Sequence, residues 1–337
     1  MKRSHTECSF ITLLFVLMIS PLTRGAPARV VQAAQTNPSP RSGYAITYDG
    51  SNRRIVLYGG MDSQSQRLSD AWTWDGRQWR QISSQGPGQR LDAFMAFDSK
   101  RGRVVLFGGS NDQQRLGDTW EFDGSKWELI TSDGPGARVL GAMAYDEQRE
   151  RLVLFGGQNA QRQKLGDTWE WDGKQWKQIT ATGPSPRSSH SIVYHAKRKT
   201  IMLLGGSGEQ ALGDLWEWNG KSWSQLNQGE LPPRLHFALG YDSRRAHLVV
   251  FGGFGARGRI GDTWEWDGKT WQELKSAGPA ARAEHDGVYF PGHGFIVFGG
   301  IIGQGLAESE RTRVNDLWQW SGKEWKLLSP ESNPPPR

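Results

Sequence analysis

Cysteine is almost absent from this sequence: its 337 residues include one, Cys8, close to the N-terminus. Cys8 lies before the apolar stretch 10–19 (FITLLFVLMI), whereas a lipoprotein's lipidated cysteine would follow such a stretch. The rest of the chain has no thiol, which excludes disulfides, thiolate metal sites and a cysteine nucleophile there. A domain of this composition must depend on its apolar core for stability.

Long apolar runs are also missing, since the sequence holds none beyond residues 10–19. Ten apolar residues are too few to cross a bilayer, which needs about 20. Lys2 and Arg3 before the run and small residues after it are typical of a signal peptide. We therefore expect residues 1–34 to be a signal peptide and the protein to be exported (secreted or periplasmic), with no membrane span in the mature chain. The alternative is a short membrane anchor that stays uncleaved.

An excess of one charge is lacking as well. The chain has 41 Lys and Arg against 35 Asp and Glu, a formal net charge of +6. The predicted signal peptide holds four of the basic residues and one of the acidic ones, which leaves 37 basic and 34 acidic residues. So weak a net charge gives no argument for a nucleic-acid partner, and we expect none.

What the sequence does contain is a repeated unit of 47 to 49 residues. Each copy starts with a Pro/Gly-rich stretch and an arginine, continues to a Gly pair and an Asp-x-Trp, and closes with another Trp. The six repeat arginines are Arg41, Arg90, Arg138, Arg187, Arg234 and Arg282. Six copies fill residues 41–328, between a linker at 35–40 and a Pro-rich tail at 329–337. A period of this length indicates a repeat architecture.

Each copy predicts four strands, named A to D, which the third copy places at 139–145, 151–155, 168–171 and 175–179. The segments are short, rich in aliphatic and aromatic residues, and bounded by turn residues. Strand B is expected to end at the Gly pair, and Asp172-Gly173 predicts a tight C–D hairpin. No segment shows a helical period. The repeat therefore predicts an all-β fold, a six-bladed β-propeller of four-stranded antiparallel blades.

The P-x-R start, the Gly pair and the D-x-W…G-x-x-W second half resemble kelch repeats, and the six copies cover nearly all of the mature chain. The resemblance implies partner binding on the face where the B–C loops and the D–A connections emerge. Kelch propellers usually close by pairing strands from both chain ends in one blade. Here all six copies look complete, so either blade 6 meets blade 1 directly or residues 35–40 help seal the join.

Three residue types, Trp, Arg and Asp, recur too regularly to mark an active site. The 17 Trp and Phe122 occupy three fixed positions per repeat, which predicts packing between blades rather than exposed sugar platforms. The repeat arginine and the Asp of Asp-x-Trp also occur once per blade. This equal number predicts a repeated ion pair or a loop-fixing hydrogen bond. The alternative is a ring of arginines that binds anions at the channel mouth.

Variation between the copies is concentrated in the B–C segments. These read MDSQSQRLS, SNDQQRLG, QNAQRQK, SGEQA and FGARGR in blades 1 to 5, and blade 6 has the longest, 301–315. The C–D turns are nearly identical by comparison. Because loops on a rigid scaffold commonly carry binding functions, we expect a ligand on the face formed by the B–C and D–A connections, here called the loop face.

One irregular polar cluster lies at the start of strand A in blades 4 to 6, and it comprises His190, His236, Glu284, His285 and Asp286. Together with the six repeat arginines, these residues are the candidate binding residues. Asp286 stands where the other copies have Ala45, Phe94, Ala142, Ser191 and Ala238. A buried charge at this position needs a partner such as Arg282 or a ligand.

Imidazoles and carboxylates on adjacent blades can ligate a metal or act as acid and base. A histidine three residues after the arginine is, however, a frequent and structural feature of the family that the repeats resemble. We expect no metal, no cofactor and no catalytic residue. Galactose oxidase chemistry, which needs a Cys–Tyr cross-link, is excluded by the missing cysteine, whereas sialic-acid epimerase/mutarotase chemistry is not excluded by composition.

The sequence thus predicts a monomeric, exported, non-catalytic kelch-type propeller that binds a protein or a glycan through its loop face. The alternative is a carbohydrate-active enzyme, similar to a sugar epimerase or mutarotase, with its site at the channel mouth.

A closed ring makes the first prediction. Truncation at Gly278 removes blade 6 and should leave an insoluble or poorly folded product, as judged by solubility and thermal unfolding. A soluble five-repeat fragment that unfolds cooperatively would contradict the closed ring.

Overall fold

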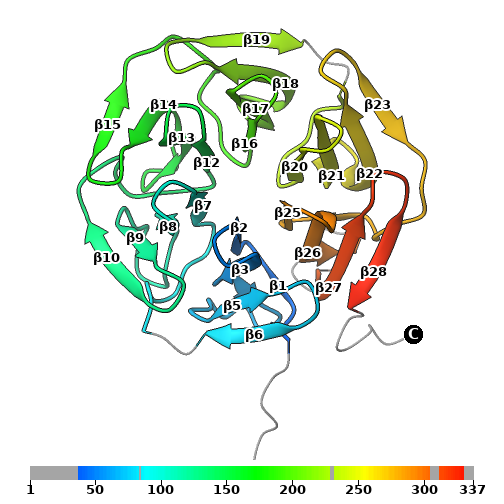
Figure 1. Ribbon diagram of the computed structural model, residues 1–337, viewed down its shortest axis with the longest axis horizontal. Coiled ribbons are helices and arrows are strands. Elements are labelled where there is room, and N and C mark those ends of the chain that lie inside the picture. The colour runs from blue at the N-terminus through cyan, green and yellow to red at the C-terminus, as the bar shows by residue number, and fades with distance from the viewer. Residues whose placement is uncertain (1–36, 83–84, 228–230, 304–310, 330–337) are drawn as a thin grey trace, which may run out of the picture. The chain divides into compact units, whose positions relative to one another are not determined.

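Six antiparallel sheets, each with four main strands, follow one another around a central axis and form the blades of a β-propeller (Figure 1). The structure is a computed structural model, and it describes residues 37–82, 85–227, 231–303 and 311–329. These ranges contain strands and no helix, and they lie in one compact unit, Gln35–Arg337. The predicted fold class is confirmed. The predicted signal peptide lies outside the described residues, as does the predicted tail after Ser329.

The strands of blades 1 and 2 have four or five residues. They are β2 (Ala45–Asp49), β3 (Arg54–Tyr58), β5 (Ala71–Trp74) and β6 (Trp79–Ile82) in blade 1, and β7 (Phe94–Asp98), β8 (Arg103–Phe107), β9 (Thr119–Phe122) and β10 (Trp127–Thr131) in blade 2.

Blades 3 to 6 have longer second and third strands. Blade 3 contains β12 (Ala142–Asp146), β13 (Arg151–Asn159), β14 (Lys164–Trp171) and β15 (Trp176–Ile179), and blade 4 contains β16 (Ser191–His195), β17 (Thr200–Ser207), β18 (Ala211–Trp218) and β19 (Trp223–Asn227). Blade 5 contains β20 (Ala238–Asp242), β21 (His247–Gly255), β22 (Gly258–Trp266) and β23 (Trp271–Leu274), and blade 6 contains β25 (Asp286–Phe290), β26 (Gly294–Ile302), β27 (Thr312–Trp320) and β28 (Trp325–Ser329). Four two-residue strands, β1 (Arg41–Ser42), β4 (Met61–Asp62), β11 (Arg138–Val139) and β24 (Arg282–Ala283), lie on the loop face.

The apolar core is divided into six clusters, and each lies between two neighbouring blades. Side chains of a strand alternate between its two sides, so one strand serves two clusters. In β3, Ile55 and Leu57 face blade 6, whereas Val56 and Tyr58 face blade 2. Second strands are covered on both sides, which explains their uninterrupted apolar sequences.

The tryptophans pack between blades, as predicted. Trp171, Trp218 and Trp320 are almost completely buried. In blades 3, 4 and 6 the last Trp also bonds to the preceding blade, as the indole N–H of Trp223 does to Thr168 at 3.0 Å. The first Trp differs, because its indole N–H donates to the Asp two residues earlier, as Trp169 does to Asp167 at 2.7 Å.

The Gly pair does not end strand B in blades 3 to 6, so this part of the strand prediction is wrong. The register of β13 against β14 shifts between Phe155 and Gly157, and pairing then continues to Gln158 and Lys164. Gly156 and Gly157 have φ of 61° and 96°, a left-handed conformation that glycine adopts at little cost. The pair therefore forms a bulge within a longer ribbon.

Each repeat arginine forms an ion pair with the Asp of its own Asp-x-Trp, as the equal numbers predicted. Arg138 donates to both carboxylate oxygens of Asp167, at 2.8 and 2.9 Å, and to the carbonyl oxygen of Gly156 at 3.1 Å. Burial alone would raise the pKa of Asp167, but the bonds and charge of Arg138 outweigh it and lower that pKa. The other five pairs are Arg41–Asp70, Arg90–Asp118, Arg187–Asp214, Arg234–Asp262 and Arg282–Asp316. The pair ties the start of strand A to the Gly pair and to strand C of the same blade.

Blade 6 meets blade 1 directly, with no strand shared between them. Their common core cluster includes Trp74 and Phe290, whose rings lie 5.6 Å apart. The linker also contributes, because the Asn315 side-chain amide donates to the carbonyl oxygen of Pro38 at 2.9 Å. Both closing contacts considered from the sequence are thus present.

The repeated ion pair makes the second prediction. Replacing Arg138 by Ala should lower the free energy of unfolding by about 2–4 kcal/mol, because it leaves the Asp167 carboxylate and a buried carbonyl without their donor. The measurement is the denaturant midpoint.

The matched control is Arg80→Ala. Arg80 is 68% exposed in its ion pair with Asp75, so its loss should cost less than about 0.5 kcal/mol. Equal losses in the two variants would contradict the stabilising role of the buried pairs.

Candidate functional site

A closed ring of backbone hydrogen bonds surrounds the axis on the loop face. It is formed by the residue two positions after each repeat arginine, and these residues are Gly43, Asp92, Leu140, Ser189, His236 and Glu284. Each N–H donates to the carbonyl oxygen of its counterpart in the preceding blade, at 2.7 to 3.3 Å, and Gly43 of blade 1 completes the circle by donating to Glu284 of blade 6. All six have φ between 54° and 61°. We call this circle the mouth ring.

The side chains of the mouth ring border a small polar pocket of about 100 Å³. Asp92 lies over Gly43, where an added Cβ would come within 2.7 Å of a carboxylate oxygen. Glu284 accepts a hydrogen bond from Ser42 at 3.1 Å. Burial, and then the charge of Glu284, raises the pKa of Asp92 to about 7. Opposite Gly43, Ser189 and the His236 ring are hydrogen-bonded at 3.1 Å.

The predicted histidine cluster divides into two groups. His236 belongs to the mouth ring, whereas His190 and His285, one position later, lie in blade interfaces and are buried. The His285 ring is bonded to the carbonyl oxygen of Phe251 at 3.1 Å, and the His190 ring lies 5.6 Å from that of Phe155. Burial, then the nearby repeat arginine, lowers the pKa of both His190 and His285 to about 3. These two imidazoles pack against the neighbouring blade and also border the mouth pocket.

Asp286 does not pair with Arg282, which the sequence offered as its partner. Arg282 is bound to Asp316 at 2.6 and 2.8 Å. The Asp286 carboxylate accepts a hydrogen bond from the adjacent Gly287 N–H at 2.7 Å. Burial raises the pKa of Asp286 to about 7. Asp286 therefore has a carboxyl group inside the channel without a described cationic partner.

The six repeat arginines are at most 3% exposed, and each is bound to its Asp partner. An anion at the channel mouth would have to displace an aspartate to reach one of them. Their predicted role in binding thus gains no support from the geometry. The described residues also include no group of three or more His, Cys, Asp or Glu side chains arranged to hold a metal ion. Across the same ranges, no helix is long and apolar enough to cross a membrane.

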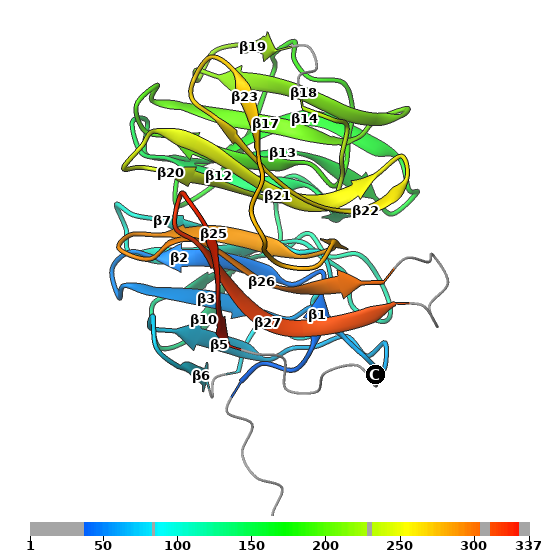
Figure 2. The same cartoon turned by 90° about the vertical axis from the view of Figure 1, so that its right-hand side faces the viewer.

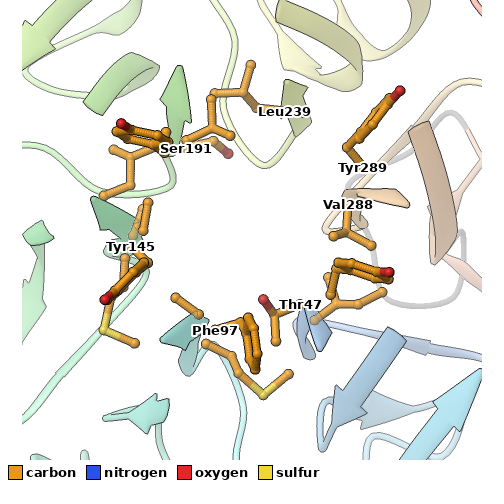
Figure 3. A pocket seen from close by; sticks show the side chains of 18 of the residues that line it. Thr47, Phe97, Tyr145, Ser191, Leu239, Val288 and Tyr289 are labelled. Carbon is orange, nitrogen blue, oxygen red and sulfur yellow. The ribbon is translucent and has the colours of Figure 1, made fainter. Parts of the chain in front are cut away.

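On the other side of the mouth ring the channel widens into a cavity of about 490 Å³ (Figure 3). Its wall carries one small or β-branched residue from each first strand, in blade order Thr47, Ala96, Ala144, Val193, Gly240 and Val288. The next residue along each strand is aromatic and also lines the cavity, namely Tyr48, Phe97, Tyr145, Tyr194, Tyr241 and Tyr289. We call this cavity the axial well. It extends from Asp286 to the A–B turns on the face opposite the loop face, here called the hairpin face.

Comparison with known proteins agrees with this architecture. The family model described as the KLHDC2/KLHL20/DRC7 Kelch-repeats domain matches residues 18–134 and 172–337. The chain belongs to this kelch-repeat family. It is similar to dynein regulatory complex subunit 7 of Chlamydomonas reinhardtii, with 37% identity over 76 residues. That match covers 21% of this kelch chain and 6% of the Chlamydomonas protein.

Asp92 and Ser189 belong to the mouth ring but were not among the predicted candidate residues. The available signal was their spacing, two positions after Arg90 and Arg187, the same as that of His236 and Glu284. The six residues share a backbone conformation, and this conformation forms the ring. Because the six residues are of different types, residue type alone does not predict it.

The third prediction concerns the half-buried carboxyl of Asp286. Its folded-state pKa, about 7, lies above the unfolded value of about 4. Between these values the folded state binds more protons, so the free energy of unfolding falls as pH rises from 4 to 7. Asp286→Asn should therefore be more stable than the parent at pH 8, by roughly 1–3 kcal/mol, and the difference should vanish near pH 4.

Denaturant unfolding between pH 4 and 8 tests this. The exposed Asp133, replaced by Asn, serves as the control and should show no such trend. An Asp286→Asn protein no more stable than the parent at pH 8 would overturn the argument.

Proposed function

We propose that this chain is an exported, non-catalytic kelch propeller that binds a protein partner through its loop face. The observation that carries this proposal is the set of four B–C hairpins that continue beyond the Gly pair in blades 3 to 6, as the long ribbons β21–β22 and β26–β27 illustrate (Figure 2). In blades 1 and 2 single bridges, Met61–Arg67 and Ser110–Arg115, join the B–C segments. The loop face is thus uneven, because the B–C hairpins of blades 3 to 6 have longer paired strands than those of blades 1 and 2.

Neighbouring B–C segments are braced against each other. Arg67 forms an ion pair with Asp112 at 2.7 Å, and Arg115 donates to the Gln158 side chain at 2.7 Å. Similar bonds join blade 3 to 4 and blade 5 to 6, from Lys164 to Ser207 at 2.9 Å and from Arg259 to Gly303 at 2.9 Å. Such bracing pre-organises a binding surface and reduces the entropy lost on association.

The charge of this rim favours an acidic partner surface. The described B–C segments hold eight basic residues, Arg67, Arg115, Arg162, Lys164, Arg257, Arg259, Arg311 and Arg313. Over their full sequence these segments hold five acidic residues, Asp62, Asp112, Glu209, Glu308 and Glu310, so basic residues outnumber acidic ones by three. Some of these like charges lie close together: burial, and then the charge of Arg162, lowers the pKa of Arg115. Opposite charge across an interface speeds association and selects partners.

The absence of catalysis and the export are parts of the same proposal. Contacts of His190 and His285 with the neighbouring blades, and their low pKa of about 3, support a packing role for these two groups. Export is supported by the basic and apolar N-terminal pattern of residues 1–34. A glycan is the other ligand class that this face is proposed to accept.

Affinity pull-down and a glycan array with the mature protein test the proposal. The variant Arg162→Glu/Arg257→Glu reverses two exposed charges on the loop face, in blades 3 and 5. We expect its affinity for the captured partner to fall about tenfold or more, since like charges placed opposite each other at an interface cost several kcal/mol.

The control Lys174→Glu/Lys269→Glu makes the same charge change in the same two blades, at exposed C–D turns of the hairpin face. It should retain the partner. Equal effects of the two variants would contradict binding through the loop face. Turnover in a screen of sugars that disappears in Glu284→Ala/His285→Ala/Asp286→Ala, with the fold intact, would contradict a non-catalytic role.

A further inference from the structure

The axial well lies beyond the mouth ring from the loop face, shares Asp286 with the mouth pocket, and has the features of a small-molecule site. Its volume of about 490 Å³ lies within the usual range for ligand pockets, about 300–1,000 Å³. The first strands of all six blades supply its wall, so the wall is as rigid as the propeller itself. Figure 3 shows Phe97, Tyr145 and Tyr289 spaced around the open centre.

Its wall is mostly apolar and aromatic, with a few polar side chains such as Thr47 and Ser191. Residues such as Ala96, Val193 and Gly240 keep the centre open, because their side chains are short or missing. Gly240 is required for close packing, since an added Cβ would come within 2.5 Å of the Phe295 ring. The six aromatic residues, one per blade, lie around the same space. Such a wall accommodates apolar groups, and aromatic faces attract cations.

The charged groups of the well are of one sign. Asp286 and Glu147 line it, and no Lys or Arg is among its described lining residues. Glu147 lies near the hairpin face and accepts a hydrogen bond from Ser99. Asp286 lies at the other end. Its carboxylate accepts a hydrogen bond from the Gly287 N–H at 2.7 Å and has no described cationic partner. An anionic ligand would meet two carboxylates here and no compensating charge.

We propose that the axial well binds a compact organic cation, an amine or ammonium with apolar substituents, whose charged nitrogen lies against the Asp286 carboxylate. The cation supplies the partner that Arg282 cannot, since both arms of Arg282 are bound to Asp316. The apolar substituents contact the small residues and aromatic rings of the wall. The raised pKa of Asp286 agrees with this arrangement, because it reflects a partly desolvated carboxyl that lacks a positive neighbour.

Replacement of Asp286 is compatible with the fold, since the matched residues of the other blades carry no charge. Ala45 and Ser191 occupy this position in blades 1 and 4. Asp286→Asn is therefore the test variant. Asp286→Ser, which reproduces the residue of blade 4, replaces it if the asparagine variant fails to fold.

The experiment is isothermal titration of the mature protein at pH 8 with hexyltrimethylammonium, and with hexanoate and hexanol as the anionic and neutral probes. We expect the ammonium to bind and hexanoate not to bind. Affinity for the ammonium should fall about tenfold or more in Asp286→Asn, because the variant removes the Coulombic attraction between the Asp286 carboxylate and the ammonium charge. Val288→Phe, which fills the well, should abolish binding.

Two controls make the result specific. Glu147→Gln removes the other carboxylate and should weaken binding less than Asp286→Asn. Arg162→Glu/Arg257→Glu alters the loop face and should leave binding of the ammonium unchanged, so this test is independent of the proposed partner binding. The proposal is overturned by absence of ammonium binding to the parent, by equal affinity in Asp286→Asn, or by comparable affinity for hexanol.

Discussion

The buried pairing of one arginine with one aspartate in every blade is the interaction on which the rest of this propeller depends. It connects three points of a blade: the start of strand A, the carbonyl group of the Gly pair and the start of strand C. Only arginine offers parallel donors to a carboxylate and a further donor to a carbonyl at the same time. The pair thus fixes the segment that enters the axis, and the mouth ring begins two residues later.

The position of the mouth ring follows from this constraint. Because the ion pair fixes each repeat arginine, the chain must turn sharply between this arginine and strand A. All six residues of the mouth ring make this turn with positive φ. Five of the six are not glycine, which is uncommon for this conformation. Their backbone groups are used within the ring, so side chains are free to differ there. The mouth ring therefore combines one repeated backbone conformation with six different residues.

Much of this was predictable from the sequence, because repetition exposes structural roles. The ion pairs and the packing of the tryptophans were evident from one Arg, one Asp and three aromatic residues per copy. The strand ends were not, since the bulge at the Gly pair depends on which residues pair across it. The candidate cluster was predicted as one group, yet consecutive residues diverge: Glu284 lies in the mouth ring, His285 packs between blades and Asp286 enters the channel. A single residue in the left-handed conformation changes the direction in which the following side chains point. Residue type alone does not predict this change.

Closure without a shared strand has a topological consequence. Every blade is built from one continuous segment, and all six interfaces, including that between blades 6 and 1, bury a cluster of the same kind. The order of the blades around the axis therefore has no privileged starting point. Joining the two ends and opening the chain between any other pair of blades would preserve each sheet and each interface. The break in the propeller chain is in this sense interchangeable among the six blade junctions.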